Sequence, residues 1–440
     1  MTYIVPAGEF DRIEDPNTGR TIVVPDSFHS VEQSPVGIFQ MFIAIQKGMM
    51  DAADIIFFVF FAYGLVYMLV KTGAFNGAVG ALLRKIEGKE KFMIPVFMLF
   101  FGICGATFGM YEETYGFVPV FMGIAVALGY DALVGAVIVF VGVATGFASA
   151  ITNPFTIGVA QGIAELPMFS GIGLRIVIWI AFMSLVIWYV MRYAAKVKAN
   201  PACSLVGDVK FPMIASMKRE ELLETPFTSR HKLSIFLFAL TIFLVVFGTI
   251  KYGWYIEELS GLFILMMVVI GLASGLNFSQ IAEAFVEACS NVVFGALVIG
   301  ISRTVLIVMQ DGCIIDTVVY YLASSVANLS AGIAAAGMVV VQNLINFFIP
   351  SGSGQAATSM PIMTPLADLI GLKRQIAVLA FQFGDGFSNL FWPTAVATEC
   401  GIAGIPIDRW YKFMGPLFVL MLILEFIFIG VAVAIGYGPF

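Results

Sequence analysis

Seven stretches of this 440-residue chain are long and apolar enough to cross a lipid bilayer as helices. Each approaches the ~20 residues that a crossing needs, and they lie at about 54–72, 132–150, 175–193, 233–250, 258–275, 290–309 and 411–436. Only 12% of the residues are charged, whereas a soluble domain would carry roughly twice that fraction. Backbone polar groups inside a bilayer must bond within the spanning structure itself. The sequence therefore predicts an all-α polytopic membrane protein and excludes a soluble fold.

Basic residues are concentrated in two places. The polar segment 194–232 holds seven Lys and Arg residues, and a second cluster comprises Arg84, Lys85, Lys89 and Lys91. Because cytoplasmic loops are enriched in Lys and Arg, we expect both on the cytoplasmic side of a cell inner membrane. The polar segment 1–35 shows no cleavable signal peptide, and we place it on the extracytoplasmic side.

The sequence also repeats itself over a long distance. The hexapeptide 162–167 (GIAELP) returns as 401–406 (GIAGIP), and Pro154 recurs as Pro393 at the same shift. In a polytopic protein such duplication is typical of carriers that hold their substrate where two structural repeats meet. We assign repeat 1 to 36–193 and repeat 2 to 276–440. Between them lie the cytoplasmic linker 194–232 and two linker helices within 233–275.

Each repeat contains two apolar arms that flank a polar tip, at 93–128 and 331–371. The arms are too short for two comfortable crossings, and non-helical backbone at membrane depth is tolerated only inside protein or beside a polar cavity. We therefore predict re-entrant helical hairpins; the alternative is two ordinary helices joined by an exposed loop. Because no basic cluster precedes the second hairpin, we expect it to enter from outside, so that the repeats are inverted.

A spanning helix after each hairpin is interrupted by polar residues, giving predicted broken helices at 132–166 and 374–404. The breaks fall at 149–154 (SAITNP) and 384–389 (GDGFSN). Proline and glycine interrupt the helical hydrogen bonds there, and the partial charges of half-helix ends can hold an ion or a carboxylate. We expect both tips and both breaks to converge near the membrane midplane.

Four motifs resemble the YfcC family, in the C4-dicarboxylate anaerobic carrier (DcuC-like) group of the ion transporter superfamily. They are 105–113 (GATFGMYEE), 153–156 (NPFT), 346–355 (NFFIPSGSGQ) and 381–386 (FQFGDG). The resemblance covers nearly the whole chain. It implies inverted repeats, a scaffold domain that forms a homodimer, and a transport domain that carries both hairpins and moves like an elevator. It also implies a first scaffold helix before the segment 2–10 (TYIVPAGEF), and that helix is apparently missing here.

The candidate site residues are polar or ionisable groups at the tips and breaks. Charge at membrane depth costs ~2.5–3.5 kcal/mol or more per group, so it tends to be functional. One of Glu112 and Glu113 is expected to face the substrate or a coupling cation, and the other to hold the tip; alternatively both satisfy hairpin amides. The predicted substrate-binding residues are Thr107, Glu112, Glu113, Asn153, Ser351, Ser353, Gln355, Thr358, Asp385 and Asn389.

A sodium site is a second hypothesis for the breaks. Asp385 lies in a stretch too apolar for a casual carboxylate, although it could instead cap the broken helix. The predicted Na⁺ ligands are Ser149, Thr152, Asn153, Asp385 and Ser388, all of which can also be ordinary helix caps. Proton coupling is the alternative, because close carboxylates raise one another's pKa. No other cofactor and no nucleic-acid partner is expected.

Three further charged residues receive structural interpretations. We expect Arg303 to pair with Asp311, Asp316 or a carbonyl rather than with substrate. Asp51 and Asp54 are expected at the membrane interface.

The sequence favours a secondary active transporter over other membrane functions. It contains no phosphate-binding Gly-x4-Gly-Lys-Ser/Thr motif for ATP-driven transport, and no His-Glu-x-x-His or Gly-x-Ser-x-Gly motif of an enzyme. Broken helices suit alternating access better than a channel. Three candidate carboxylates favour an amino acid substrate, with a basic amino acid, as in arginine/ornithine exchange, as one candidate. Its transport is expected to be coupled to Na⁺ or H⁺ or run as antiport. A C4-dicarboxylate is the alternative.

Overall fold

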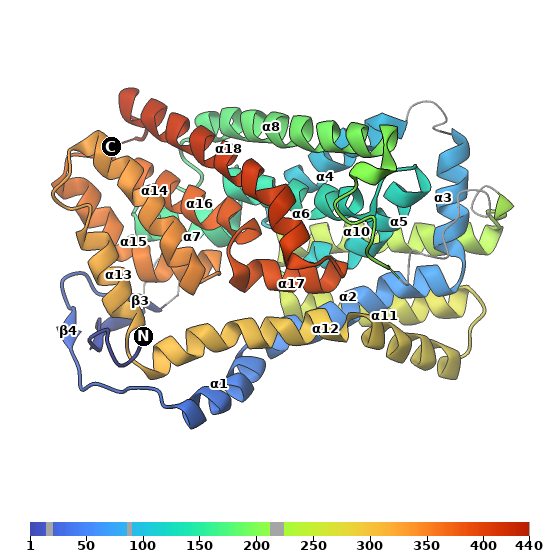
Figure 1. Cartoon of the computed structure of the whole chain (residues 1–440), viewed down its shortest axis with the longest axis horizontal. Helices are drawn as coiled ribbons and strands as arrows, with labels where there is room; N and C mark the ends of the chain where they lie inside the picture. The colour runs from blue at the N-terminus through green and yellow to red at the C-terminus, as the bar shows by residue number, and fades with distance from the viewer. Residues whose placement is uncertain (15–20, 86–89, 212–223, 440) are drawn as a thin grey trace.

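The computed structural model describes residues 1–14, 21–85, 90–211 and 224–439 (Figure 1). Parts of the cytoplasmic linker and of the basic cluster at 84–91 lie outside these residues. The described chain contains nine helices long and apolar enough to cross a bilayer. The prediction of a polytopic helical membrane protein is thus confirmed.

The N-terminal segment corrects the expectation that the fold is all helical. Strand β1 (Gly8–Glu9) pairs antiparallel with β4 (His29–Ser30), and β2 (Arg12–Glu14) pairs with β3 (Thr21–Val23). Residues 21–23 are β-branched, which favours extended backbone. The short strands are held mainly by contacts to α13 and α15 of the second half of the chain.

The first half of the chain begins with a series of helices and short helical turns. They are α1 (Ile38–Asp51), α2 (Ala53–Lys71), α3 (Ala74–Lys85), η1 (Glu90–Phe92), α4 (Met93–Phe108), η2 (Glu112–Phe117), α5 (Val118–Ala127), α6 (Ala132–Ser149), η3 (Pro154–Gly158) and α7 (Val159–Ile163). The half ends with α8 (Ile172–Ala199), and the short η4 (Pro201–Cys203) follows.

The second half follows the same order after two linker helices, α10 (Ser229–Tyr252) and α11 (Ile256–Ala273). Its elements are α12 (Phe278–Asp311), α13 (Ile315–Ser324), α14 (Ala331–Phe348), α15 (Gly352–Leu369), α16 (Arg374–Gly386), η5 (Phe387–Leu390), α17 (Pro393–Ala403) and α18 (Ile407–Ala434). The sequence suggested a spanning helix that starts near residue 290. Instead one unbroken helix, α12, covers the amphipathic stretch as well.

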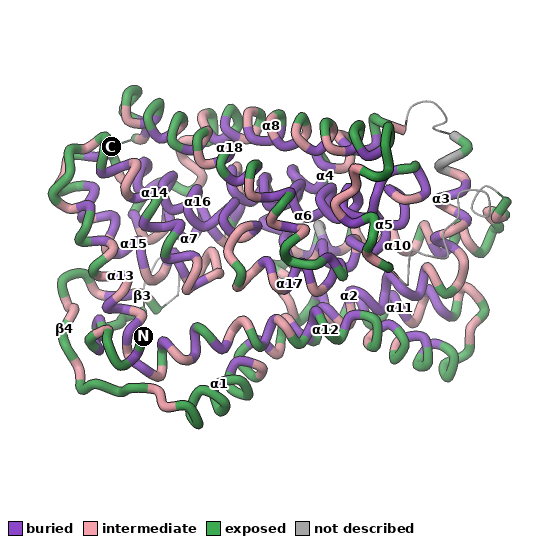
Figure 2. Tube along the Cα trace, in the orientation of Figure 1, coloured by how far each residue is buried: buried purple, intermediate pink, exposed green. Residues whose placement is uncertain are grey.

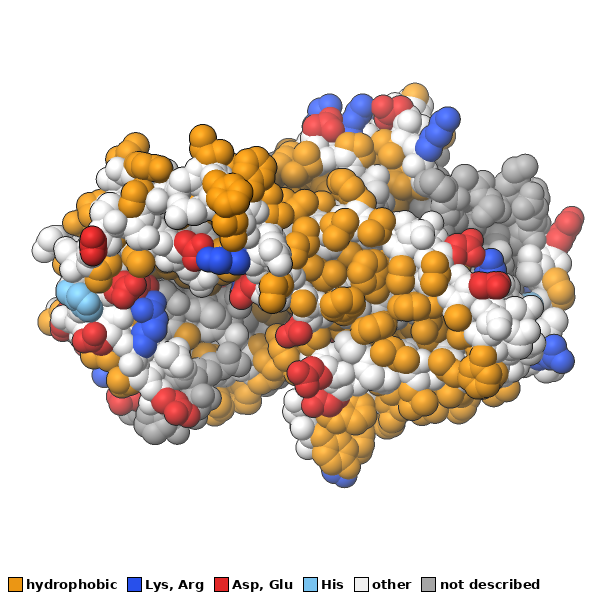
Figure 3. Space-filling view, turned by 90° about the horizontal axis from the view of Figure 1, so that it is seen from below, with side chains coloured by type: hydrophobic (Ala, Val, Ile, Leu, Met, Phe, Trp, Pro, Cys, Tyr) orange, Lys and Arg blue, Asp and Glu red, His pale blue; other side chains and the backbone are white. Residues whose placement is uncertain are grey.

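The helices form two packed layers. The first layer, called here the scaffold layer, contains α1, α2, α11 and α12 along the lower side of Figure 1, together with α10, which packs on α11. The second layer contains both hairpins, both broken helices, α8 and α18. Its centre is α6, whose residues are all buried (Figure 2). Figure 3 shows that side chains on the underside of the molecule are mostly hydrophobic, as expected for a surface that contacts lipid.

Close packing of α4 on α6 explains the glycines in both helices. A Cβ on Gly105 would lie 2.9 Å from the backbone nitrogen of Phe147, and one on Gly146 would lie 2.9 Å from that of Ala106. Small residues let membrane helices approach to backbone contact. Because these glycines have no side chains, α4 of the first hairpin packs directly against the backbone of α6.

The two hairpins extend into the molecule from opposite ends. Helices α4 and α5 lie in the half of Figure 1 that contains α3, whereas α14 and α15 lie in the half that contains both chain termini. The turn at residues 109–111 and the turn at 349–351 then meet in the middle of the second layer. This is the arrangement that places four polar elements around one point.

Candidate functional site

A cavity of about 330 Å³ lies between the scaffold layer and the two hairpin tips. This volume falls at the lower end of the ~300–1,000 Å³ typical of small-molecule sites. The second layer contributes both tips and both breaks to the wall, among them Glu112, Glu113, Thr156, Ser351, Gly352, Ser353 and Asn389. The convergence expected from the repeat is therefore present in the structure. We call this the central cavity.

The first tip presents two carboxylates in different ways. Helix α4 ends at Gly109, which has φ +69°, a left-handed conformation that glycine adopts most easily. One carboxylate oxygen of Glu113 accepts a hydrogen bond from the backbone N–H of Tyr111 at 2.9 Å, so it holds the turn. In the described residues, the Glu112 side chain bonds to no other residue, and it lines the cavity half-buried.

The second tip presents neutral donors. Ser351 caps α15, its hydroxyl accepting from the Gly354 N–H at 3.4 Å. Among the described residues, the backbone amides of Gly352 and Ser353 have no acceptor. The amino end of a helix with free amides favours negative groups. This tip can therefore bind a carboxylate, while the first tip repels one.

The first break is organised by Asn153. Its side-chain oxygen accepts from the N–H groups of Phe155 and Thr156 at 2.9 and 3.3 Å, so Asn153 caps η3. The predicted sodium ligands nearby are engaged locally. Ser149 donates to carbonyls one turn back in α6, and Thr152 donates to the Thr107 carbonyl at 3.2 Å. Neither lines the central cavity.

The second break encloses a carboxylate that lacks partners. Asp385 is fully buried, and within the described structure neither of its carboxylate oxygens accepts a hydrogen bond. The amide nitrogen of Asn346, on α14, donates to the Asp385 carbonyl and to the Ser388 hydroxyl, both at 2.6 Å. Asn389 also donates to the Asp385 carbonyl, at 2.7 Å. These bonds fix the backbone and leave the carboxylate free.

Other orphaned oxygens lie near this carboxylate. The side-chain oxygens of Asn346 and Thr156 are buried and also lack partners in the described part of the chain. Gly352 lies beside both Thr156 and Asp385, since a Cβ on Gly352 would come within 3.0 Å of an Asp385 carboxylate oxygen and would contact the Thr156 methyl. Hard cations bind oxygen ligands of this kind. Asn346 and Thr156 therefore join the predicted Na⁺ ligands as candidates, because hydroxyls that donate a proton to a carbonyl keep lone pairs for a cation.

Like Asn153 and Asp385, three further predicted substrate-binding residues do not line the central cavity. The Thr107 hydroxyl donates to the Ile103 carbonyl at 2.6 Å. The buried Gln355 side chain donates to the backbone and side-chain oxygens of Gln342, both at 2.8 Å. Thr358 lines a second cavity, described below.

The scaffold wall corrects the partner expected for Arg303. Asp51 and Asp54, expected at the membrane interface, line the central cavity. Arg303 lines it too and forms an ion pair with Asp51. The partners expected for Arg303 are engaged elsewhere, since Asp311 pairs with Lys47 at 2.7 Å and Asp316 pairs with Arg12 at 2.8 Å. Sequence position alone did not indicate that α12, which carries Arg303, lies beside α1, which carries Asp51.

The charges in the cavity wall are unbalanced. Within the described residues, one guanidinium faces four carboxylates, those of Asp51, Asp54, Glu112 and Glu113. The cavity therefore has an excess of three negative charges when all these groups are ionised. Because charge in a low-dielectric site is costly without a partner, this wall favours a cationic ligand.

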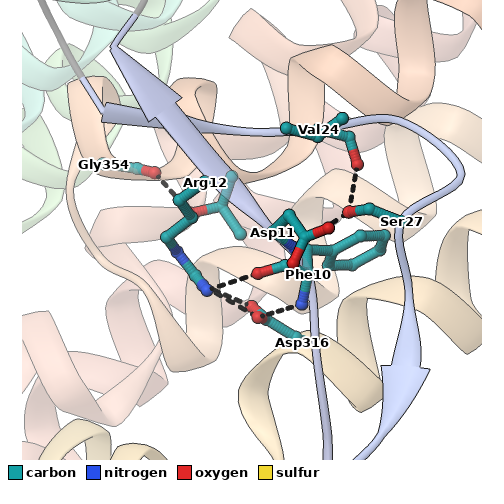
Figure 4. A network of polar contacts seen from close by, with 8 residues as sticks. Phe10, Asp11, Arg12, Val24, Ser27, Asp316 and Gly354 are labelled. Atoms are coloured by element: carbon teal, nitrogen blue, oxygen red, sulfur yellow. Dashed lines mark hydrogen bonds and ion pairs between the residues drawn. The ribbon is translucent and has the colours of Figure 1, made fainter.

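A second cavity, of about 460 Å³, adjoins the first on the side of the N-terminal strands. It shares Arg303, Leu306 and Ser351 with the central cavity. Figure 4 shows Arg12 bonded to Asp316 beside Gly354 of the second tip. The Phe10 N–H donates to the same carboxylate at 3.0 Å. The N-terminal segment thereby forms part of a vestibule that leads to the second tip.

Sequence reasoning missed the buried carboxylates of Glu399 and Glu425, of which Glu399 lies beside the cavity. Glu399, on α17, is fully buried and accepts a hydrogen bond from the Tyr111 hydroxyl at 2.8 Å. The signal was available, because an ionisable residue in an apolar membrane segment is a functional candidate. Glu399 lies just before the hexapeptide 401–406, which the sequence reasoning used only to mark the repeat.

A polytopic helical protein with two hairpin tips around a polar internal cavity is a membrane carrier by its architecture. Comparison gives the particular family: residues 1–434 match the C4-dicarboxylate anaerobic carrier family, DcuC, and the chain belongs to it. It is similar to the protein of Escherichia coli (strain K12) named "Putative basic amino acid antiporter YfcC", with 31% identity over 99% of this chain and 94% of that protein. The family consists of carriers, so the chain is a transporter and not an enzyme.

Two further similarities accompany this assignment. A protein of Haemophilus influenzae is 31% identical over 94% of this chain and 82% of its own length. The crystal structure of the YdaH transporter of Alcanivorax borkumensis aligns over 98% of this chain and 95% of that one, with a TM-score of 0.45 and 15% identity.

Proposed function

We propose that this protein is a secondary active transporter of a basic amino acid, working in the cell inner membrane by exchange or by coupling to Na⁺ or H⁺. The observation that carries the proposal is the excess of carboxylates in the central cavity, four against one guanidinium in the described wall. The name of the Escherichia coli relative agrees with this substrate class.

The two tips suggest how such a substrate is oriented. Its α-carboxylate would meet the free amides of Gly352 and Ser353 at the amino end of α15. Its cationic side chain would point toward Glu112 and Asp54, since Asp51 is paired with Arg303 and Glu113 holds the first tip. Charge-assisted hydrogen bonds are roughly twice as strong as neutral ones, so these contacts would provide both affinity and orientation.

Movement of the second layer against the scaffold layer would provide alternating access. The central cavity lies between these layers, and the hairpins enter from opposite ends (Figure 1), as inverted repeats would place them. An elevator movement and a homodimer formed through the scaffold are part of the proposal because the family resemblance implies them.

A C4-dicarboxylate carrier is the second candidate function. The family description favours it, and the neutral second tip could bind one carboxylate of such a substrate. The other carboxylate would then face Glu112 and Asp54, which requires cations or protons to neutralise the wall. This requirement is why we place it second.

Counterflow in proteoliposomes tests the choice of substrate. Vesicles loaded with unlabelled arginine should accumulate external labelled arginine, lysine or ornithine, and the uptake should saturate. Vesicles loaded with succinate and given labelled succinate or fumarate should not. Exchange of the dicarboxylates alone would contradict the proposed substrate class, and unsaturable flux of both would indicate a channel.

The coupling ion is tested at Asp385. If a cation binds among Asp385, Asn346 and Thr156, imposing a Na⁺ or pH gradient should drive net uptake by the wild-type protein. Asp385→Asn should abolish that response, because it removes the only formal charge in the group. Asp26→Asn, an exposed change in the N-terminal segment, is the matched control. A gradient response that survives in Asp385→Asn would exclude this ion site.

A further inference from the structure

A buried carboxyl group connects the far side of the first tip to the central cavity. Glu399 has no exposed surface, and one of its carboxylate oxygens accepts from the Tyr111 hydroxyl at 2.8 Å. Its other oxygen has no partner in the described structure. Thr398 and Tyr111 both line the cavity, so Glu399 lies directly behind the wall. We propose that Glu399 is a proton-binding site, and that a cationic substrate in the cavity displaces its proton.

Within the described residues, no cationic side chain forms an ion pair with Glu399. Tyr111, Tyr115 and Glu112 of the first tip lie close enough to interact with it electrostatically, and Cys400 is its neighbour on α17. Helices α12, α18, α14 and α5 and the short η5 pack against α17, and of these only α12 and α18 carry charged or titratable residues. Their charged and titratable residues are, on α12, Glu283, Glu287, Cys289, Arg303 and Asp311, and on α18, Asp408, Arg409, Tyr411, Lys412 and Glu425.

The cationic residues among these have other partners. Arg303 pairs with Asp51, Arg409 pairs with Asp208 at 2.9 Å, and Lys412 pairs with Asp408 at 3.6 Å. An isolated buried carboxylate is far more costly than a neutral carboxyl group with one unmet polar atom. Protonation of the oxygen that lacks a partner therefore removes the buried charge of Glu399, while the other oxygen keeps its hydrogen bond from Tyr111.

The position of Tyr111 links this proton to the substrate. Its hydroxyl donates to Glu399 while its backbone N–H donates to Glu113, so one residue joins Glu399, behind the cavity wall, to Glu113, in the wall. A cation that enters the cavity stabilises the ionised form of Glu399. The O–H bond of Glu399 then breaks, the proton leaves to water in the cavity, and the carboxylate stays behind. This step rests on the proposed function, because it requires a cationic substrate.

Infrared spectroscopy of the purified protein tests the proton without any substrate. Wild type should show the C=O band of protonated carboxyl groups, and Glu399→Gln should lose one component of it. Tyr111→Phe should shift that component, because the hydrogen bond to the carbonyl oxygen is lost. Glu425→Gln, which removes a buried carboxyl on α18, should lose a different component that Tyr111→Phe leaves in place. If Glu399→Gln instead loses a carboxylate band, the proposal is wrong.

Calorimetry with arginine tests the linkage. Titrations in buffers of different ionisation enthalpy should show that wild type releases up to one proton per arginine bound, and that Glu399→Gln releases fewer. Arginine affinity of wild type should rise with pH, because ionised Glu399 adds a negative charge, and Glu399→Gln should flatten that profile. Equal release by both proteins would overturn the linkage.

The two measurements separate the two proposals. If arginine does not bind at all, the proposed function fails, while the infrared band still decides whether Glu399 holds a proton. If Glu399→Gln does not fold, the shift in Tyr111→Phe decides instead, and an unshifted band overturns the assignment.

Discussion

The two hairpin tips occupy equivalent places in their repeats and meet at one cavity, yet their chemistry is opposite. The first tip carries Glu112 and Glu113, with Glu399 behind it. The second tip carries hydroxyls and free amides at the start of α15. The tips converge because they are equivalent parts of two repeats. They can bind different chemical groups because the sequences of the two tips differ. A cavity with an acidic end and an amide-rich end fits a ligand that is cationic at one end and anionic at the other.

Removing the charge of the first tip should have the largest effect. Glu112→Gln replaces a carboxylate that faces the cavity, and hydrogen bonds to charged groups contribute ~1.5–3 kcal/mol. Arginine affinity should therefore fall at least about tenfold, measured by calorimetry and by initial uptake rate. Glu165→Gln, whose carboxylate is largely exposed, is the matched control. Unchanged affinity in Glu112→Gln would remove this residue from the site.

Filling the space at the second tip should have the next largest effect. A Cβ on Gly352 would contact the Thr156 methyl and approach an Asp385 carboxylate oxygen to 3.0 Å. Overpacking of this kind costs ~1–3 kcal/mol, so Gly352→Ala should lower both the uptake rate and the melting temperature. Gly332→Ala, near the start of α14 with open space around it, should change neither. A fully active Gly352→Ala would show that the tip is looser than described.

A milder change separates the two adjacent carboxylates. Glu113→Gln keeps an oxygen that can accept from the Tyr111 N–H, so it loses only the charged character of that bond, worth ~1 kcal/mol. We expect arginine affinity to fall roughly two- to fivefold, clearly less than in Glu112→Gln. If the order of the two variants is reversed, Glu113 is the ligand and Glu112 holds the tip.

The smallest effect tests the anionic end of the ligand. Ser353→Ala removes one hydroxyl from the cavity wall, which is worth ~0.5–1.5 kcal/mol if it bonds the substrate. Arginine affinity should fall by a few fold. Agmatine, which lacks the carboxylate of arginine, should bind both proteins equally. An equal loss for both compounds would place the carboxylate elsewhere.

Sequence reasoning located the fold and the neighbourhood of the site because both depend on local patterns. Apolar length gave the spanning helices, and repeated glycine and proline residues gave the tips and breaks. What it could not give were partners on neighbouring helices. Arg303 pairs with Asp51 of α1, and nothing in the local sequence of either residue indicates that their helices are neighbours.

The ligand groups at the breaks show the same limit. Ser149, Thr152 and Ser388 each donate a hydroxyl proton to a nearby carbonyl, and the sequence did not show these bonds, which orient the hydroxyl oxygens. Asn346 was inside a recognised motif but was not singled out. Its role depends on α14 packing against α16, a tertiary contact. Residue type narrows the candidates, and only packing shows which polar atoms stay unsatisfied.

The unbroken helix α12 has a consequence for the surrounding lipid. Its 34 residues give a length of ~51 Å at 1.5 Å per residue, well beyond the ~30 Å hydrocarbon core of a bilayer. A helix this long must tilt, extend into the headgroup region, or thicken the membrane locally. Hydrophobic mismatch would then act on the scaffold layer, so bilayer thickness should alter how α12 is inclined against the cavity that it lines.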